Sequence, residues 1–340
     1  MTQKAAILPA LDEDVVVRDH PIPTPNANQL LVKMTAAAVN PLDHIHRSIS
    51  IRIKSYPAVL GCDGAGVVEE VGSAVEGFKK GDRVFFQVDF HINNESAAFQ
   101  QYALADPKLV GRIPPNVTDE EASTLPTALA TTVGSLFDKT GFAPPIDGPT
   151  VSNEPIVILG GSGSMGRSPR ITGFSPIITT CSKQHIESVK QIGATHAFER
   201  TVTAEDIYSV LNQSGKPLRF VVDGVAITET QIFAYNLLTK QPNAPPEEEL
   251  QIQVLLPPTE ELLALAKSGR VKVGMVDGGA YMLRDLNAPF FAASGRWLEE
   301  GKLVPSKVQI IEGGLKSVPE ALDTVAKGVS GAKLVIRPQE

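Results

Sequence analysis

An apolar strand that runs directly into a glycine-rich turn is the feature that most constrains the fold of this chain. Residues 155–166 read PIVILGGSGSMG, in which Ile156–Leu159 precedes the spacing Gly161-x-Gly163-x-x-Gly166. The first glycine permits a tight turn, the second lets a pyrophosphate approach the backbone, and the third lets the next helix pack on the strand. The pattern predicts a dinucleotide-binding turn with phosphate at a helix N-terminus. An ordinary glycine-rich loop is the alternative.

The next apolar segment indicates which dinucleotide is bound. It runs PIITTCSK, from Pro176 to Lys183, and ends without an acidic residue. An NAD site places Asp or Glu there to accept from the ribose 2′-hydroxyl. Here no carboxylate repels a 2′-phosphate and the Lys183 ammonium can meet it, so we predict NADPH. The alternative is that Lys183 is a solvated surface lysine.

The connection between these two strands is short. A helix from Ser164 to Thr172 has nine residues, roughly 14 Å at 1.5 Å per residue, whereas a five-residue strand spans roughly 17 Å. Pro169 also disfavours helix at Ser168. We therefore expect a short or distorted helix after Gly166, with weakened cofactor binding as its consequence.

The chain changes character along its length, as two domains in 340 residues would. Its first 125 residues are β-rich, with short apolar runs separated by Pro, Gly and Asp. These runs are Leu30–Val32, Gly66–Val71, Arg83–Val88 and Gln101–Leu104. A helical apolar pattern with acidic residues in its first turn follows over Asp119–Leu136.

From residue 155 onward strands and helices alternate, which predicts a doubly wound parallel sheet with helices on both faces. The expected strands are Pro155–Leu159, Pro176–Thr180, Ala197–Phe198, Phe220–Asp223, Ile252–Leu256 and Val271–Val276. The expected helices include Gln184–Ile192, Ala204–Leu211 and 289–303, and the tail ends in a strand, Lys333–Ile336.

Composition excludes several classes of partner and site. The net charge of −7 and the pI near 5.5 argue against nucleic acid and anionic membranes. Two cysteines 119 residues apart, without CxxC, argue against a structural zinc site or a disulfide scaffold. The opening MTQKAAILPALDED is not a signal peptide, and no apolar run reaches about 18 residues. We expect a cytoplasmic protein.

Eight blocks of sequence occur in a characteristic order. They are AAAVNPLD (36–43), YPAVLGCDGAGVVEEVGSAVEGFKKGDRVF (56–85), AFQQYALADP (98–107), TLPTALATT (124–132), the glycine turn, IGATHAF (192–198), VVDGVA (221–226) and SGAKLVIRP (330–338). In this order the chain resembles the medium-chain dehydrogenase/reductases, particularly the fungal zinc-independent quinone oxidoreductases and enoyl reductases. The resemblance implies an α/β fold. A Rossmann domain (126–282) is inserted into a GroES-like, β-rich catalytic domain (1–125 and 283–340).

The resemblance also indicates whether this chain has the catalytic zinc site of related enzymes. The zinc-dependent branch places a Cys, a Gly-His-Glu and a second Cys around a catalytic ion. This chain has Asn40 in the first region, Gly61-Cys62-Asp63 in the second and no cysteine near Leu125–Thr127. One soft ligand does not make a zinc site. The resemblance therefore implies zinc-independent hydride transfer from NADPH to an α,β-unsaturated carbonyl, a quinone or an enoyl thioester.

Site residues are carried over from the family motifs. They are Asn40 and Thr131 at the nicotinamide, both also catalytic candidates; Leu255 and Leu256 over its face; Gly161, Ser162, Gly163, Ser164, Met165 and Gly166 at the pyrophosphate; Ser182 and Lys183 at the 2′-phosphate; Lys333 near the cofactor phosphates; and Phe290 and Phe291 in the substrate cleft. Each has an alternative. Asn40 caps the turn at Pro41, Thr131 bonds its own helix backbone, and the two phenylalanines pack in the core or in a dimer.

No proton donor is identifiable in the sequence. The tyrosine that some enoyl reductases place after the NPxD motif is missing, so water would protonate the product enolate. His44 and His46 are interpreted as surface-loop residues, and Asp63 and Asp82 as turn residues that bond local backbone.

Three readings of function compete. The leading one is an NADPH-dependent reductase of a small-molecule or carrier-bound acyl substrate. The second is a one-electron NADPH:quinone reductase. The third is a catalytically impaired scaffold of the same fold, because of the short helix after Gly166. The family resemblance also implies a homodimer that forms through the edge strand Val271–Val276.

Overall fold

The computed structural model describes the chain except residues 12, 50, 89–93, 139, 164–168, 243, 245–249 and 277. The described residues form two compact units. Unit 1 consists of Met1–Thr127, Gly279–Gly301 and Pro305–Glu340, and unit 2 of Ala128–Gly278 and Lys302–Val304. Unit 1 thus combines an N-terminal part with a C-terminal part, and its first break follows residue 127 where the sequence suggested 125.

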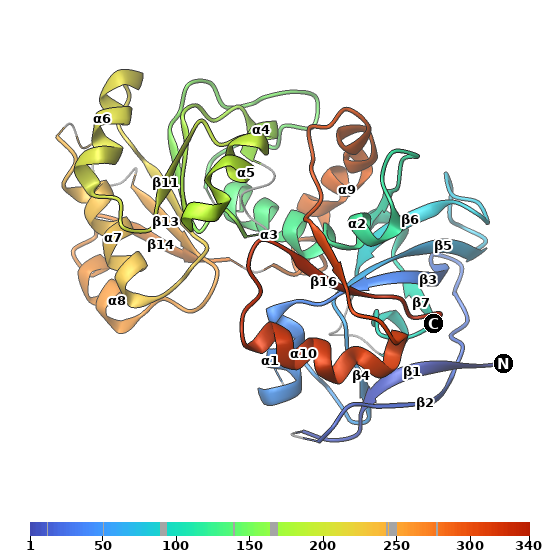
Figure 1. Ribbon diagram of the computed structural model, residues 1–340. Helices are drawn as coiled ribbons and strands as arrows, with labels where there is room; N and C mark the ends of the chain where they lie inside the picture. Colours follow the sequence, from blue (N-terminus) through green and yellow to red (C-terminus); the bar gives the residue numbers. More distant parts are fainter. Residues whose placement is uncertain are drawn as a thin grey trace. The chain divides into compact units, whose positions relative to one another are not determined.

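Unit 1 is built on a seven-stranded sheet in its described residues (Figure 1). Its strand order is β15 (Val308–Ile310), β16 (Lys333–Ile336), β3 (Leu30–Ala38), β5 (Asp63–Val71), β6 (Arg83–Gln87) and β8 (Val110–Arg112), and β7 (Tyr102–Ala105) also pairs with β3. A smaller sheet has the order β2 (Val16–Pro21), β1 (Thr2–Leu8) and β4 (Ala58–Val59). The C-terminal strand β16 pairs antiparallel with β3, with Val335 opposite Ala38. The two ends of the sequence therefore meet in one sheet.

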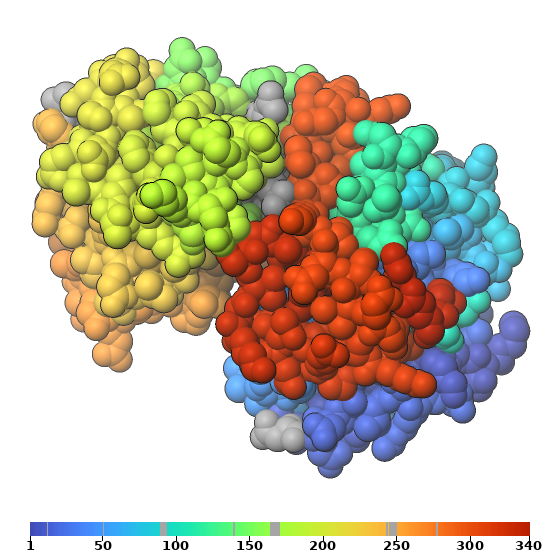
Figure 2. All heavy atoms as spheres, viewed as in Figure 1, coloured from blue at the N-terminus to red at the C-terminus, as the bar shows by residue number. Residues whose placement is uncertain are grey.

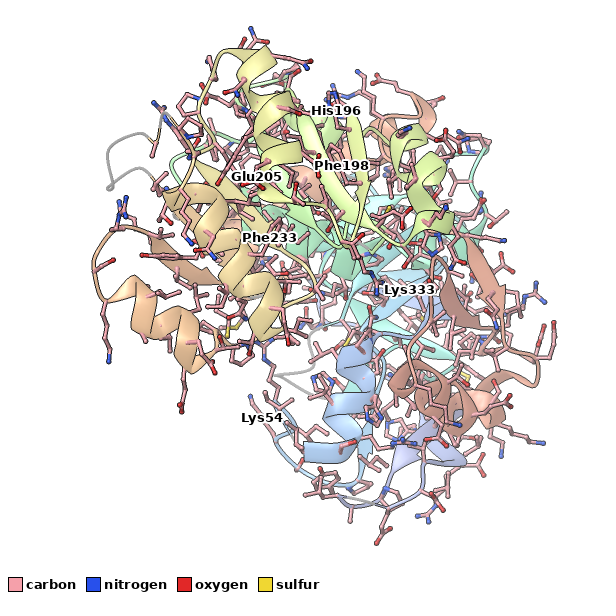
Figure 3. The ribbon with its side chains drawn as sticks, turned by 60° about the vertical axis from the view of Figure 1, so that its left-hand side comes forward. Lys54, His196, Phe198, Glu205, Phe233 and Lys333 are labelled. Atoms are coloured by element: carbon pink, nitrogen blue, oxygen red, sulfur yellow. The ribbon has the colours of Figure 1, made fainter. Side chains whose placement is uncertain are left out.

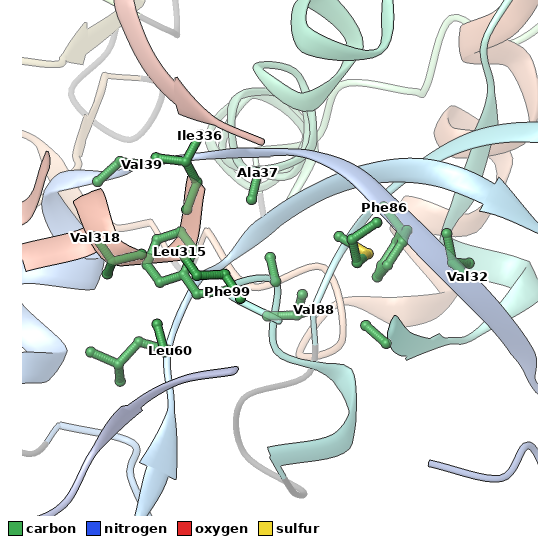
Figure 4. Packing of buried hydrophobic residues seen from close by; sticks show 14 of the residues in the cluster. Val32, Ala37, Val39, Leu60, Phe86, Val88, Phe99, Leu315, Val318 and Ile336 are labelled. Atoms are coloured by element: carbon green, nitrogen blue, oxygen red, sulfur yellow. The ribbon is translucent and has the colours of Figure 1, made fainter. Parts of the chain in front are cut away.

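The core of unit 1 lies between this sheet and the helix α10 (Val318–Ala326). Figure 4 shows Phe86 and Phe99 among aliphatic side chains from the strands, with Leu315 and Val318 from the C-terminal part. Phe86, Phe99 and Val318 are at most 1% exposed. In Figure 2 the atoms of the C-terminal segment border those of the N-terminal segment on the same face of unit 1. The remaining helical segments are α1 (Pro41–Ile49), η1 (Asn94–Ser96), η2 (Pro107–Leu109), α2 (Asp119–Ser123), α9 (Arg284–Glu299) and η6 (Gly314–Ser317).

The single helix expected over Asp119–Leu136 was wrong. The structure has two helices there, α2 and α3 (Pro126–Phe137). Thr118 begins α2 with a capping box. The Thr118 hydroxyl accepts from the backbone N–H of Glu121, and the Glu121 carboxylate accepts from the backbone N–H of Thr118. Pro126 cannot donate to a carbonyl one turn earlier, so it ends the first helix and starts the second as its first residue.

Unit 2 contains a parallel six-stranded sheet in its described part, which confirms the Rossmann fold. The strand order is β11 (His196–Glu199), β10 (Ile177–Cys181), β9 (Ile156–Leu159), β12 (Phe220–Asp223), β13 (Gln251–Val254) and β14 (Lys272–Met275). From β9 the chain proceeds to one side of the sheet and then returns to add β12 on the other side. The carboxyl ends of β9 and β12 therefore form the switch point where such sheets bind ligands.

The helical segments of unit 2 are α3, α4 (Pro169–Thr172), η4 (Lys183–His185), α5 (Ile186–Gln191), α6 (Ala204–Ser214), α7 (Thr228–Thr239) and α8 (Glu260–Ala266). Phe198 from β11 and Phe233 from α7, both labelled in Figure 3, pack against the core that includes Val157 and Leu237. In the β9–β10 connection the described residues include the helix α4, and residues 164–168, where the predicted short helix would begin, lie outside the described residues.

Both cysteines, Cys62 and Cys181, are buried free thiols. None of the helices within the described residues has the length and apolar character needed to cross a bilayer.

Candidate active site

Asn40 and Lys333, two of the predicted site residues, contact each other in unit 1. The ammonium nitrogen of Lys333 donates to Asn40 Oδ1 at 2.5 Å, and Asn40 Nδ2 donates to Asp63 Oδ2 at 3.1 Å. Lys333 Nζ lies 3.8 Å from the same Asp63 oxygen. Figure 3 shows Lys333 near the start of α1, the helix that Asn40 precedes. Sequence positions far apart are thus joined in one polar cluster.

The cluster extends on the other side of Asp63. Asp63 Oδ1 accepts from the backbone N–H of Thr127 at 2.9 Å and from its hydroxyl at 2.6 Å. Gln87 Nε2 donates to the Thr127 hydroxyl at 2.9 Å, and the Gln87 carbonyl accepts from the N–H of Ala280. We call Asn40, Asp63, Gln87, Thr127 and Lys333 the polar network. All five residues belong to unit 1.

Asp63 is the centre of this network and was misread from the sequence. It was expected to bond local backbone in a turn, but it begins β5, is 0% exposed and bonds residues 23 and 64 positions away. Burial raises the pKa of its carboxyl, and Lys333, Thr127 and Asn40 act in the opposite direction. Asp82 does behave as predicted, since it accepts from the N–H of Lys79 at 3.1 Å.

Asn40 does not cap α1 with its side chain. The Asp43 carboxylate accepts from the Asn40 N–H at 2.7 Å, and the Asp43 N–H donates to the backbone carbonyl of Asn40. The alternative reading of Asn40 as a capping side chain is therefore wrong. The amide is left to face Asp63 and Lys333.

A second buried group lies next to the network. Asp43, His46 and Cys62 offer a carboxylate, an imidazole and a thiol whose ligand-type atoms all lie within 4.8 Å of one another. His46 is 2% exposed within α1, so its reading as a surface-loop residue was wrong; His44, on the same helix, is half-buried. The spacing of Asp43 and His46 on one helix face could have suggested this.

Burial and mutual contact shift the pKa values of Cys62 and Asp43 in this group. The Cys62 thiol bonds the Asp43 carboxylate, and burial with two neighbouring carboxylates raises the pKa of that thiol well above its usual value. Burial also raises the pKa of Asp43 to about 6, against the opposing effects of the thiol and the Asn40 N–H.

The glycine turn occupies the carboxyl end of β9 in unit 2. Gly160 has φ +82°, and the N–H groups of Gly160 and Gly161 both donate to the Thr180 carbonyl of β10. A Cβ added to Gly161 would lie 1.9 Å from the Thr179 hydroxyl oxygen, so only glycine fits there. Ser162 is half-buried and Gly163 is exposed. The predicted residues Ser164, Met165 and Gly166 lie outside the described residues.

Ser182 and Lys183 follow β10 directly, at the same end of the sheet. Ser182 precedes η4 without using its hydroxyl as a cap, and Lys183 is exposed. Leu255 and Leu256 follow β13 in the same way: Leu255 is half-buried near Gly224, and Leu256 is 49% exposed. The structure therefore brings these four predicted residues to the carboxyl edge that also carries the glycine turn.

Thr131 lies on α3 and is half-buried. The helix-backbone bond proposed as its alternative role belongs instead to Thr132, which donates to the Ala128 carbonyl at 2.8 Å. A Cβ added to Gly278 would lie 2.7 Å from the Thr131 hydroxyl oxygen. The hydroxyl thus faces the backbone that follows β14.

Phe290 and Phe291 lie on α9 and are 3% and 0% exposed. The Phe291 ring lies 6.2 Å from that of Phe85, and the Phe290 ring lies 5.9 Å from that of Trp297, edge to face. Within unit 1 these are packing contacts, which was the alternative to the predicted role in a substrate cleft.

Comparisons with known proteins agree with this architecture. Residues 26–115 match the alcohol dehydrogenase GroES-like domain. The chain is 30% identical over 364 residues to the trans-enoyl reductase tndF of Aspergillus flavipes, and the match covers 98% of each chain.

Two solved structures share the fold. An alcohol dehydrogenase superfamily protein from Novosphingobium aromaticivorans has a TM-score of 0.80 at 22% identity, over 99% of each chain. The quinone oxidoreductase from Coxiella burnetii has a TM-score of 0.73 at 22% identity, also over 99% of each. Given the identity along nearly all of both sequences and the two expected folds, this oxidoreductase belongs to the enoyl reductase branch of the medium-chain dehydrogenase/reductase superfamily.

Proposed function

We propose that this protein is a zinc-independent, NADPH-dependent reductase of the carbon–carbon double bond in an α,β-unsaturated carbonyl compound, most specifically an enoyl thioester. The observation that carries the zinc-free part is the polar network. By resemblance, Asn40, the Cys62–Asp63 pair and the Leu125–Thr127 region stand where zinc-dependent relatives hold their ion. Here the Lys333 ammonium already lies 3.8 Å from the Asp63 carboxylate, and a divalent cation there would be repelled by it.

A nicotinamide dinucleotide fits the carboxyl edge of unit 2. The edge combines a switch point, a glycine turn without Cβ atoms at Gly160 and Gly161, and an exposed lysine after the second strand. A reduced nicotinamide supplies a hydride when it is bound.

The proposed contacts follow from this placement. Gly161, Ser162 and Gly163 present backbone to the pyrophosphate, and Ser182 with Lys183 binds the 2′-phosphate through hydroxyl and ammonium donors. Leu255 and Leu256 exclude water from the nicotinamide face, and Thr131 orients the ring. The family resemblance adds Asn40 of unit 1 as a further nicotinamide contact.

The substrate assignment rests on the relative named as a trans-enoyl reductase. We extend to this chain a small or carrier-bound acyl substrate, and action as a cytoplasmic enzyme, in keeping with two buried free thiols. A homodimer through the edge strand β14 is part of the same proposal.

The test is NADPH oxidation, followed at 340 nm, by purified protein with a 2-enoyl thioester, a simple enone and a quinone in separate assays. We expect turnover with the thioester, little with NADH, and no loss after dialysis against a chelator. Turnover with quinone alone would make the protein a quinone reductase. NADPH binding without turnover of any acceptor would favour the impaired scaffold.

A further inference from the structure

The Lys333 ammonium has more hydrogen-bond donors than the protein uses. An ammonium carries three N–H donors, and in the described structure one of them reaches Asn40 Oδ1. The Asp63 oxygen at 3.8 Å is an ion-pair partner beyond hydrogen-bond distance. The Lys333 side chain is only 10% exposed, so bulk water solvates it poorly. The two remaining donors of this nearly buried cation are available to an oxygen acceptor from a ligand.

The network fixes where those donors point. The Asn40 amide lies between a cation and a carboxylate, so its oxygen must face Lys333 and its NH₂ must face Asp63. The reversed amide would place NH₂ against the ammonium and oxygen against the carboxylate. Asp63 is held in turn by two bonds from Thr127. Lys333 is thus preorganised rather than free to swing.

The charge of the site selects the kind of oxygen. Asp63 is fully buried and balances most of the Lys333 charge at 3.8 Å. A phosphate would bring one or two full negative charges beside that carboxylate. A carbonyl oxygen arrives neutral and becomes negative only as the reaction proceeds, which suits a preorganised donor.

We propose that Lys333 is a catalytic residue that binds the carbonyl oxygen of the unsaturated substrate and donates the proton that completes its reduction, while Asn40 and Asp63 act as positioning residues. This inference rests on the proposed function and supplies the proton donor that the sequence did not reveal. It replaces the phosphate contact that the family resemblance implied for Lys333.

The step balances as follows. A hydride from a reduced nicotinamide adds to the β-carbon, a new C–H bond forms there, and the π electrons move onto the carbonyl oxygen. The N–H bond of Lys333 breaks and its proton passes to the enolate, which becomes the neutral saturated carbonyl compound directly or through its enol. Lys333 is left as an amine, and it regains a proton from water.

The first arm of the test needs neither cofactor nor turnover. 4-Nitrophenol mimics an enolate oxygen, and its absorbance reports whether it is ionised. We expect the wild-type protein to bind the phenolate in preference to the phenol, and Lys333→Met to weaken phenolate binding at least tenfold. Lys333→Arg keeps the positive charge and should therefore retain phenolate binding. Lys327→Met, at an exposed lysine, is the matched control.

The second arm separates binding from proton donation. Arginine remains protonated in proteins, so it can bind an oxyanion without giving up a proton. We expect Lys333→Arg to lower kcat by about 10²- to 10⁴-fold with an unchanged NADP⁺ dissociation constant. Because Lys333→Met leaves Asp63 without its counter-charge, Lys333→Met/Asp63→Asn provides a neutral variant should the single one unfold.

Three results would overturn the inference. One is equal phenolate binding by the wild type and Lys333→Met, or none by the wild type. Another is Lys333→Arg turning over at the wild-type rate. The third is a tenfold weaker NADP⁺ affinity in Lys333→Met at unchanged kcat, which would return Lys333 to a cofactor phosphate. Failure of the proposed function differs from all of these, since the wild type would then bind phenolate through Lys333 and reduce no enoyl substrate.

Discussion

Lys333 donates to the side-chain oxygen of Asn40 although 293 residues separate them in the sequence. The contact links the strand at the C-terminal end of unit 1 to the residue that precedes its first helix, and it holds a cation beside the buried carboxylate of Asp63. The relationship joins two distant parts of the sequence within unit 1.

Asn40→Ala should destabilise the protein by about 3 kcal/mol, since it removes two hydrogen bonds to charged partners that stay buried. Urea unfolding followed by circular dichroism measures this. Asn28→Ala, at an exposed asparagine, serves as the control and should change the free energy of unfolding by less than about 0.5 kcal/mol. A loss below 1 kcal/mol in Asn40→Ala would show that the amide is dispensable to the network.

Lys183→Glu should weaken NADPH binding at least tenfold, about 1.4 kcal/mol, because it replaces an attractive charge with a repulsive one at the 2′-phosphate. NADH affinity should stay within about twofold. Calorimetric titration of both nucleotides measures the two values, with Lys190→Glu on the neighbouring helix as control. Unchanged NADPH preference would remove Lys183 from the cofactor site.

Because of Asp43, the free energy of unfolding should decrease as pH rises. Its folded pKa of about 6 lies above the ordinary 3.8, so its protonated form stabilises the fold below pH 4 and this contribution is lost as pH rises through 6. Between pH 4 and 7 the wild type should therefore lose about 3 kcal/mol relative to Asp43→Asn. The measurement is urea unfolding across that range, and the exposed Asp14→Asn variant should track the wild type. Parallel profiles for Asp43→Asn and the wild type would contradict the assignment.

Metal removal should leave the enzyme unchanged. The Lys333 ammonium supplies the positive charge beside Asp63, and it would repel a divalent cation there. Elemental analysis should find well under one zinc per chain, and chelator dialysis should not change turnover. Added cobalt should give no thiolate absorption band; such a band, absent in Cys62→Ala, would reveal a metal site at Asp43, His46 and Cys62.

Local sequence pattern was sufficient for unit 2. The strand Phe220–Asp223 has the predicted ends, and β9 and β10 each differ from prediction by one residue at one or both ends. Parallel strands are continuous apolar runs between glycine-rich turns, so their signal lies within a few residues. The apolar period over Asp119–Leu136 continues through Pro126, so the pattern did not reveal the break between α2 and α3.

The polar network was less accessible to sequence reasoning. Asn40 and Lys333 were both named as site residues, but only through resemblance and in different roles. Asp63 was assigned to a turn because glycines flank it, and nothing local shows that it is buried beside a lysine 270 positions away. Long-range pairing is set by the register of β16 on β3, which no local pattern encodes.

The position of β16 has a consequence for the order in which the protein is made. At 5–20 residues per second, Lys333 is synthesised roughly 15–60 s after Asn40. Until then the nascent N-terminal part lacks both the neighbouring strand for β3 and the counter-charge for Asp63. During this interval the buried carboxylate of Asp63 has no lysine beside it, and the arrival of β16 supplies the strand next to β3 and the positive charge next to Asp63 in a single step.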